Sequence, residues 1–141
     1  MMATCRLFLD GCVLMDFYTA RKGADDAETI LALAERKVVE CVTSSLVICT
    51  LTYLFEQYKI LPKKDIPPAV DSLMKIVGVL PVGKEELESA VNSAGKDFED
   101  NVEMACAEKG CDYIITDNMK HFLHSSKPVL TPSQFLKAFF A

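Results

Sequence analysis

The stretch that most constrains the fold of this chain is residues 96–122, KDFEDNVEMACAEKGCDYIITDNMKHF. An acidic cluster opens a helical pattern, and a Lys-Gly pair at 109–110 ends it. The apolar run 113–115 follows as a short buried strand and leads through a threonine into Asp117 and Asn118. In open α/β sheets, ligands bind beyond the carboxyl ends of the strands, so we expect Asp117 and Asn118 at a binding site.

The start of the chain repeats this pattern, because the short apolar run 6–9 ends in Asp10. Two buried strands that each end in a carboxylate offer the oxygen ligands that a hard cation needs. Mg²⁺ usually takes only one or two carboxylates from a protein. An uncompensated buried acid is unfavourable, so acids gathered at neighbouring strand ends indicate a cation between them.

Predicted strands and helices alternate along the chain, which indicates an α/β fold whose parallel sheet is covered on both faces. No repeat, low-complexity segment or linker divides the sequence, so we expect residues 1–141 to form a single domain. We expect strands at 6–10, 38–43, 78–82, 112–116 and 128–130, and helices at 12–21, 25–37, 46–59, 65–77, 84–92, 97–109 and from 131 onward.

The composition is that of a globular protein, with half of the 141 residues hydrophobic and a quarter charged. The net charge of −5 argues against a broad electrostatic grip on nucleic acid, although a local patch and a metal ion can still hold phosphates. Since no apolar stretch approaches about 18 residues, we expect no transmembrane helix. We see no secretory signal and expect a cytoplasmic protein with mostly buried free thiols at its six cysteines, residues 5, 12, 41, 49, 106 and 111.

Two cysteines and two histidines near the end of the chain raise the alternative of a zinc site. The Cys106-x4-Cys111 spacing does not suit a zinc finger, and Cys106 falls on the core-facing side of its predicted helix. We therefore favour buried thiols over zinc for this group, which also includes His121 and His124.

Three segments carry a resemblance to a known family. LFLDGCVLMDFYTAR resembles the opening of PIN domains, and KDFEDNVEMACAEKGCDYIITDNMKHF resembles the second half of the same domain. VLTPSQFLKAF resembles the closing strand and helix of one bacterial branch. The resemblance implies a three-layer α/β/α fold with a five-stranded parallel sheet. It also implies a metal-dependent ribonuclease, in many members the toxin of a VapC-type toxin–antitoxin pair.

In that family, acidic residues hold Mg²⁺ or Mn²⁺, and a metal-activated water attacks the RNA phosphodiester bond. The resemblance assigns Asp10 to the first acid of the family and Asp100 to the acid at the start of the late helix. Asn118 falls where many members have Asp, and Asp117, one position earlier, offers a substitute. The remaining family acid falls at Thr50, which cannot carry a charge.

These acids also have simpler structural explanations. Asp97 is a natural N-cap, and an acid such as Glu99 is favoured in the first helical turn by the helix dipole. Asp10 could act only as an N-cap, and residues 117–118 suit a plain turn. With the family pattern, we keep the capping explanation for Asp97 and Glu99 alone.

The leading hypothesis is therefore an endoribonuclease weakened by one missing acid. The alternative is a degenerate, non-catalytic PIN-like domain that binds RNA or a protein, and a Rossmann-like small-molecule binder is disfavoured because no Gly-rich phosphate loop follows the first strand. In the leading hypothesis, the catalytic residues are Asp10, Asp100 and Asp117, the metal ligands are these three with Asn118, and the substrate-binding residues are Thr50, Lys120 and His121.

The resemblance further implies an RNA substrate, an antitoxin protein that covers the site, and a homodimer. The apolar helices expected at 46–59 and 65–77 are either contact surfaces for such partners or part of the core. For Lys120 and His121, a contact to RNA phosphate and a solvated loop remain equal alternatives.

Overall fold

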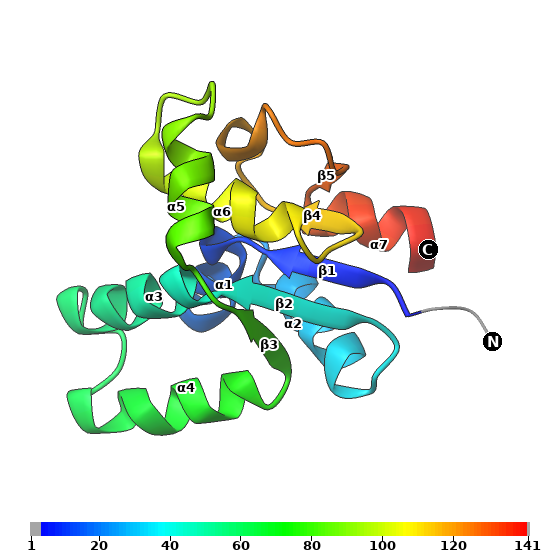
Figure 1. Ribbon diagram of the computed structural model, residues 1–141. Helices are drawn as coiled ribbons and strands as arrows, with labels where there is room; N and C mark the ends of the chain where they lie inside the picture. Colours follow the sequence, from blue (N-terminus) through cyan, green and yellow to red (C-terminus); the bar gives the residue numbers. More distant parts are fainter. Residues whose placement is uncertain (1–3, 141) are drawn as a thin grey trace.

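The computed structural model describes residues 4–140 as a parallel sheet of five strands between two layers of helices (Figure 1). The order of the strands in the sheet is β3-β2-β1-β4-β5, so the two strands predicted to end in acids, β1 and β4, are neighbours. This arrangement confirms the predicted α/β/α fold. The strands are β1 (Arg6–Leu9), β2 (Glu40–Ser44), β3 (Val77–Leu80), β4 (Tyr113–Ile115) and β5 (Val129–Leu130).

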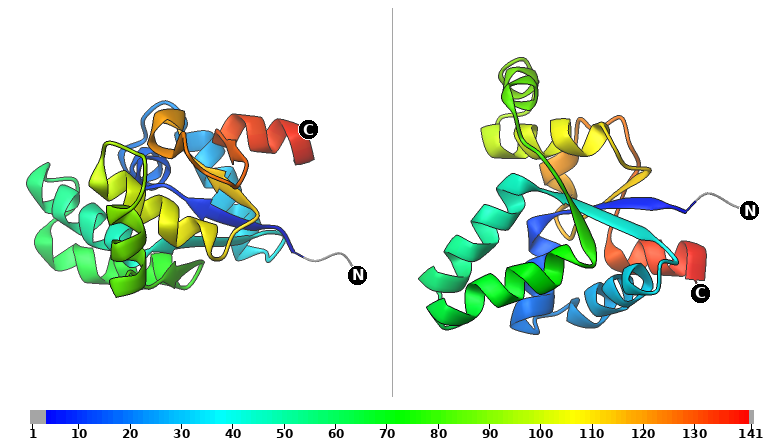
Figure 2. Two further views of the ribbon diagram at one scale, coloured as in Figure 1. Left: turned by 45° about the horizontal axis from the view of Figure 1, so that its top comes forward. Right: turned by 60° about the horizontal axis from the view of Figure 1, so that its bottom comes forward.

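Seven α-helices and two short 3-10 turns make up the layers within the described residues. Helix α6 and the helix packed on it, α5, lie on one side of the sheet, and α2 and α4 lie on the other (Figure 2). The helices are α1 (Gly11–Thr19), α2 (Ala24–Glu35), α3 (Ser45–Gln57), α4 (Ile66–Met74), α5 (Lys84–Val91), α6 (Phe98–Glu108) and α7 (Pro132–Phe140), and the 3-10 turns are η1 (Lys63–Asp65) and η2 (Met119–Phe122).

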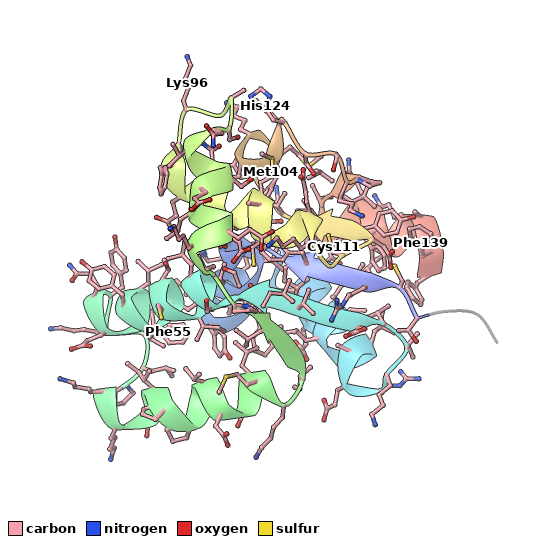
Figure 3. The ribbon with its side chains drawn as sticks, in the orientation of Figure 1. Phe55, Lys96, Met104, Cys111, His124 and Phe139 are labelled. Carbon is pink, nitrogen blue, oxygen red and sulfur yellow. The ribbon has the colours of Figure 1, made fainter. Side chains whose placement is uncertain are left out.

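Strand β1 separates two hydrophobic clusters because its successive side chains point to opposite faces. Leu7 and Leu9 join the larger cluster, with α1, α2, α3, α4 and α7. Phe8 joins the smaller cluster beneath α6 and η2. Figure 3 labels Phe55 of the first cluster and Cys111 of the second. Burial on both faces is the usual environment of a parallel sheet. The alternation along β1 also determines which layer of helices each side chain near the strand end faces.

Polar residues cap three helices that bear on the site. The Asp10 carboxylate accepts from Gly11 N at 2.8 Å, the Ser44 hydroxyl from Val47 N at 3.0 Å, and the Asp97 carboxylate from Asp100 N at 2.9 Å. The capping role predicted for Asp97 is confirmed. Each cap satisfies a free N–H of the first helical turn and so fixes where the helix leaves the sheet.

Most predicted element ends differ from those of the structure by one or two residues, and two of the differences misplace a valine. The strand predicted at 38–43 runs over Glu40–Ser44, because Val38 lies in the turn after α2 with 44% of its surface exposed. The helix predicted at 65–77 ends at Met74, and Val77 instead opens β3, where it pairs with Cys41. Short apolar runs without flanking turn residues fit a strand and a helix equally well, so periodicity alone misplaced both ends.

All six cysteines are free thiols, and Cys41, Cys106 and Cys111 are buried as expected. Cys49 is exposed on α3, so the expectation of buried thiols fails there. Within residues 4–140, no helix combines the length and hydropathy that crossing a membrane requires.

Candidate active site

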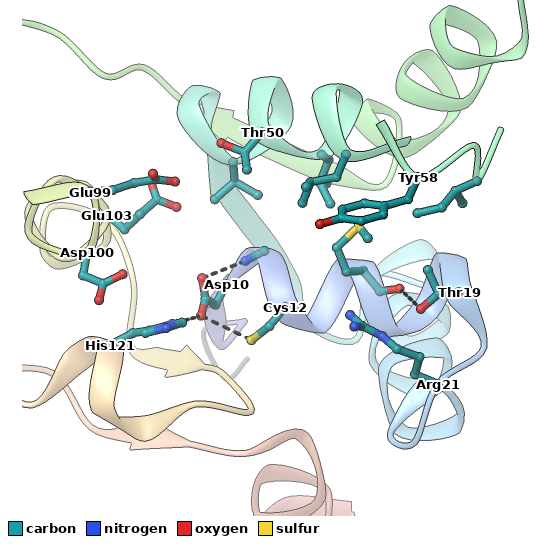
Figure 4. Close-up of a pocket in the computed structure, with 16 residues that line it drawn as sticks. Asp10, Cys12, Thr19, Arg21, Thr50, Tyr58, Glu99, Asp100, Glu103 and His121 are labelled. Atoms are coloured by element: carbon teal, nitrogen blue, oxygen red, sulfur yellow. Dashed lines mark hydrogen bonds and ion pairs between the residues drawn. The ribbon is translucent and has the colours of Figure 1, made fainter. Parts of the chain in front are cut away.

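A cleft of about 580 Å³ lies at the carboxyl end of β1, between α1, α3 and α6 (Figure 4). One part of its wall is acidic and contains residues of β1 and α6. The other part is apolar and comes mainly from α1 and α3, with Arg21 and Tyr58 beside it. The acidic wall consists of Asp10, Glu99, Asp100 and Glu103, and the apolar wall includes Met15, Val47, Leu51, Leu54 and Ile60.

Asp10 is buried, and its carboxylate is held from several directions. Besides the bond from Gly11 N, it accepts from the Thr116 hydroxyl at 2.8 Å and from the Cys12 thiol at 3.3 Å. His121 Nδ1 lies 3.1 Å from Asp10 Oδ2 (Figure 4). A carboxylate fixed in this way is pre-organised for its ligand, since little conformational freedom remains to be lost on binding.

Thr116 connects this acid to the polar end of β4. Asp10 N donates to Ile115 O at 3.0 Å, which places the residues that follow β1 and β4 side by side. The buried Thr116 hydroxyl then donates to Asp10 and accepts from Asn118 N at 3.0 Å. The sequence analysis gave Thr116 no role in the site. Its position directly after a buried strand, at the edge of the sheet where ligands bind, was the available signal.

His121 and Asn118 form a pair at the start of η2. Asn118 Nδ2 lies 3.0 Å from His121 Nε2, and Asn118 Oδ1 accepts from Lys120 N at 3.2 Å. A ring with its proton on Nδ1 satisfies both contacts, because it donates to Asp10 and accepts from the Asn118 amide. Asn118 therefore supports His121 rather than facing the cleft, and His121 lies at the wall of the cleft against Asp10.

Helix α6 contributes Asp100 and Glu103 one turn apart. Burial raises the pKa of Asp100, the charge of His121 lowers it, and the nearby Asp97 and Asp10 raise it. Burial raises the pKa of Glu103 to about 8, a hydrogen bond from Ser44 opposes the shift, and repulsion from Asp10 adds to it. Both acids are thus harder to ionise than usual, mainly because burial disfavours the charged form and secondly because other acids are near.

Glu103 was missed by sequence reasoning. It occupies a mid-helix position between residues of the buried face, Val102 and Cys106, where a glutamate is unusual. Its spacing of three from Asp100 places both on one side of the helix, and that spacing was the available signal.

Asp117 is not brought into this cleft. Its carboxyl faces that of Asp16 on α1, and Asp16 in turn pairs with Arg21 at 3.2 Å. Burial, the hydrogen bond with Asp16 and the charges of Asp16 and Asp10 together raise the pKa of Asp117 to about 7, against the opposing charge of Arg21. Asp117 is thus absent from the cleft lining, although it is near enough to Asp10 for the charge of Asp10 to raise its pKa.

Two of the three predicted substrate-binding residues line the cleft, and the third does not. Thr50 lines the cleft from α3, and His121 lines it from η2. Lys120 is exposed and lies outside the lining, next to His121 in sequence.

The acidic wall has the donor chemistry of a site for Mg²⁺ or Mn²⁺. Across residues 4–140, no three or more His, Cys, Asp and Glu side chains converge on one point as a complete protein cage for a metal. Mg²⁺ does not need such a cage, because one or two carboxylates with water and substrate phosphates suffice. The carboxylates of Asp10 and Asp100 fit that mode, and their mutual repulsion favours a cation beside them.

Comparisons with known proteins agree with this architecture. The family model described as PIN domain matches residues 6–120. The curated protein Ribonuclease VapC1 of Aquifex aeolicus (strain VF5) is 29% identical over 138 residues, which cover 92% of this chain and 92% of that protein.

Two solved structures are similar in fold. A toxin-antitoxin complex from Klebsiella pneumoniae contains a chain with a TM-score of 0.65 and 19% identity, covering 89% of this chain and 97% of that one. A second similar structure is VapBC2 from Rickettsia felis bound to a DNA fragment from their promoter. Its matching chain has a TM-score of 0.66 and 15% identity, and the match covers 89% of this chain and 98% of that one. At these identities the likeness shows the shared fold.

Proposed function

Because this chain belongs to the PIN domain family, we propose that it is an endoribonuclease that hydrolyses RNA phosphodiester bonds with Mg²⁺ or Mn²⁺ in the cleft at Asp10. The observation that carries the proposal is the arrangement of the Asp10 carboxylate. It is buried at the end of β1, fixed by Thr116 and His121, and faces further acids of α6 across one open cleft.

In this proposal, Asp10 and Asp100 hold the cation. When bound, the metal lowers the pKa of a water molecule and neutralises charge on the phosphate. Thr116 and His121 keep Asp10 in one orientation, since each contacts Oδ2. Asn118 maintains the orientation of the His121 ring and reaches the site only through it.

The charge distribution limits how RNA can be held. The net charge is −5, and Arg21 is the one Lys or Arg side chain among the described residues that line the cleft. Lys120, exposed next to His121, is in a position to meet a phosphate outside it. We therefore expect phosphate binding to depend on the metal and on few cations, with a correspondingly shallow dependence of affinity on salt concentration.

We further propose that the protein is the toxin of a toxin–antitoxin pair, a homodimer that acts in the cytoplasm. Support comes from Ribonuclease VapC1 and from the toxin-antitoxin complexes among similar structures. An antitoxin reading frame beside the gene would agree with this role. Co-expression with that frame, followed by affinity purification, tests whether the two proteins form a complex that no longer cleaves RNA.

The decisive experiment is cleavage of single-stranded RNA by the purified protein with Mn²⁺ or Mg²⁺, beside EDTA and Asp10→Asn. We expect cleavage that requires metal and that Asp10→Asn abolishes. Asp97→Asn is the matched control, because asparagine caps a helix as well as aspartate and the exposed side chain lies outside the cleft lining. Metal-independent cleavage, or full activity of Asp10→Asn, would contradict the proposal.

Thr50 favours a second candidate, a non-catalytic domain that binds RNA. This residue lines the cleft from α3 at a position where the family carries an acid. Binding of a fluorescent single-stranded RNA without cleavage in either metal, by folded protein free of antitoxin, would establish that candidate instead.

A further inference from the structure

The α3 side of the cleft contains no acid. Its lining residues are Val47, Thr50, Leu51 and Leu54. The nearest acid on this helix, Glu56, is exposed and pairs with Lys63 at 3.7 Å, so its charge is directed elsewhere. Any cation in the cleft must therefore take its negative ligands from other elements.

Helix α6 presents such a ligand in Glu103. This side chain lines the cleft, yet the residue is only 5% exposed. A glutamate this deeply buried is ordinarily paired with a cation. Among residues 4–140, no Lys, Arg or His forms an ion pair with it.

Ser44 fixes the orientation of Glu103. The Ser44 hydroxyl accepts from Val47 N at 3.0 Å and donates its own hydrogen to Glu103 Oε1. Only one of the two carboxylate oxygens is therefore engaged by Ser44. Ser44 ends β2, so Glu103 is held from one strand end.

Asp10 is held in the same manner from the other side. The hydroxyl of Thr116, directly after β4, donates to Asp10 Oδ2. Thr43 Oγ1 also donates to Leu9 O at 2.8 Å, which ties the ends of β1 and β2 together. Two carboxylates, each oriented by a hydroxyl from a neighbouring strand end, thus border one cleft with Asp100 (Figure 4).

We propose that Glu103 supplies the acidic ligand that α3 lacks, so that the cation of the cleft is bound from β1 and α6 alone. This inference rests on the metal site of the proposed function and adds a residue to it. Because Asp10, Asp100 and Glu103 do not converge on one point, we expect water to complete the coordination of the cation.

The test is isothermal titration of purified protein with Mn²⁺ alone, in the absence of RNA. We expect Glu103→Gln to weaken Mn²⁺ binding about tenfold or more, the range typical of lost metal-site groups. Glu88→Gln is the matched control, because Glu88 is an exposed glutamate of α5 that lies outside the cleft lining. It should change the affinity by less than about twofold, within the effect of a screened surface charge.

Thermal unfolding without metal separates a ligand from a structural residue. Glutamine keeps the shape of the side chain and an acceptor for Ser44, so Glu103→Gln in EDTA should melt at about the same temperature as the wild type. A lower melting temperature together with unchanged Mn²⁺ affinity would assign Glu103 a structural role and overturn the proposal. Glu103→Asp, which keeps the charge, should bind Mn²⁺ with intermediate affinity and provides a second variant.

RNA cleavage, measured in parallel, distinguishes this inference from the proposed function. Equal Mn²⁺ affinity of wild type and Glu103→Gln, with cleavage by the wild type, would overturn the role of Glu103 and leave the ribonuclease. Weakened binding by Glu103→Gln, with no cleavage by either protein, would support the role of Glu103 and remove the ribonuclease. A wild-type protein that binds no Mn²⁺ would overturn both.

Discussion

Glu86 and Glu103 are the two buried glutamates among the described residues, and their surroundings differ. Glu86, 6% exposed, lies in the first turn of α5, where its carboxylate pairs with Lys109 and accepts from Gly83 N at 2.7 Å. Glu103, 5% exposed, has the hydroxyl of Ser44 and no cation. Lys109 thus provides the counter-charge of Glu86, whereas Glu103 faces an open cleft without one.

The pKa values of the two side chains follow this difference. The hydrogen bond from Lys109 lowers the pKa of Glu86, while burial raises that of Glu103 to about 8. The charge of Glu86 is already balanced by Lys109, so this acid needs no external cation. The ion pair connects α5 to the end of α6. A buried acid that repels its neighbours becomes favourable when a cation arrives, and that property separates a binding residue from a structural one.

The largest effect that separates the two glutamates should be on RNA cleavage. We expect Glu103→Gln to reduce the single-turnover rate at limiting Mn²⁺ by about 100-fold, the upper range for lost metal-site groups. Glu86→Gln should stay within about threefold, because Glu86 lies outside the cleft lining and acts on stability. Equal losses in both variants would show that stability alone explains the effect of Glu103.

An acid introduced on α3 should restore part of the Mn²⁺ affinity that Glu103→Gln loses. In the double variant Thr50→Glu with Glu103→Gln, the acid moves across the cleft to α3, at the position the family uses. We expect about a tenfold gain in Mn²⁺ affinity over Glu103→Gln alone, the size of one ligand. Thr50→Gln in the same background is the control. A gain with glutamine would show that the charge is not responsible.

The sequence predicted what local chemistry determines. Alternating runs predicted the parallel sheet, and Asp97 was predicted as a cap because capping depends only on neighbouring residues. Asp10 was predicted to lie at a strand end, where ligands bind in such a sheet, and Asp100 was assigned to the same site by the resemblance to PIN domains. The errors at Val38 and Val77 arose because short apolar runs have no decisive periodicity.

Two features of the site needed three-dimensional information. Successive residues at a strand end point to opposite sides, so Thr116 faces Asp10 and its neighbour Asp117 faces Asp16. The sequence prediction, which assigned Asp117 to the metal, did not consider this alternation, and the role of Asp117 stays a prediction. Glu103 was missed because its environment depends on Ser44, 59 positions away, and no local pattern contains that contact.

The pH dependence of stability should also differ between the two glutamates. The pKa of Glu103 in the folded state, about 8, exceeds that of an unfolded glutamate, about 4.3. The folded state therefore binds more protons between these values, and this contribution to stability is present at low pH and lost as pH rises through 8. For Glu86 the folded pKa is lowered, so its contribution is lost as pH falls.

Urea unfolding of metal-free protein at pH 5 to 9 measures this contrast. Relative to Glu103→Gln, the wild type should lose stability as pH rises and level off above about pH 8. Saturating Mn²⁺ should flatten the difference, because the cation favours the ionised acid. A difference that is independent of pH would show that Glu103 is ionised throughout and already compensated within the fold.

The smallest effect is expected at Asp117, an acid outside the cleft. Asp117→Asn should alter the cleavage rate by less than about threefold, since the side chain hydrogen-bonds with Asp16 and lies outside the cleft lining. The amide of asparagine can donate to the Asp16 carboxylate without sharing a proton, so melting at pH 8 should be unchanged or slightly higher. If Asp117→Asn instead abolished cleavage and Mn²⁺ binding, the loop after β4 would have to rearrange when the cation binds.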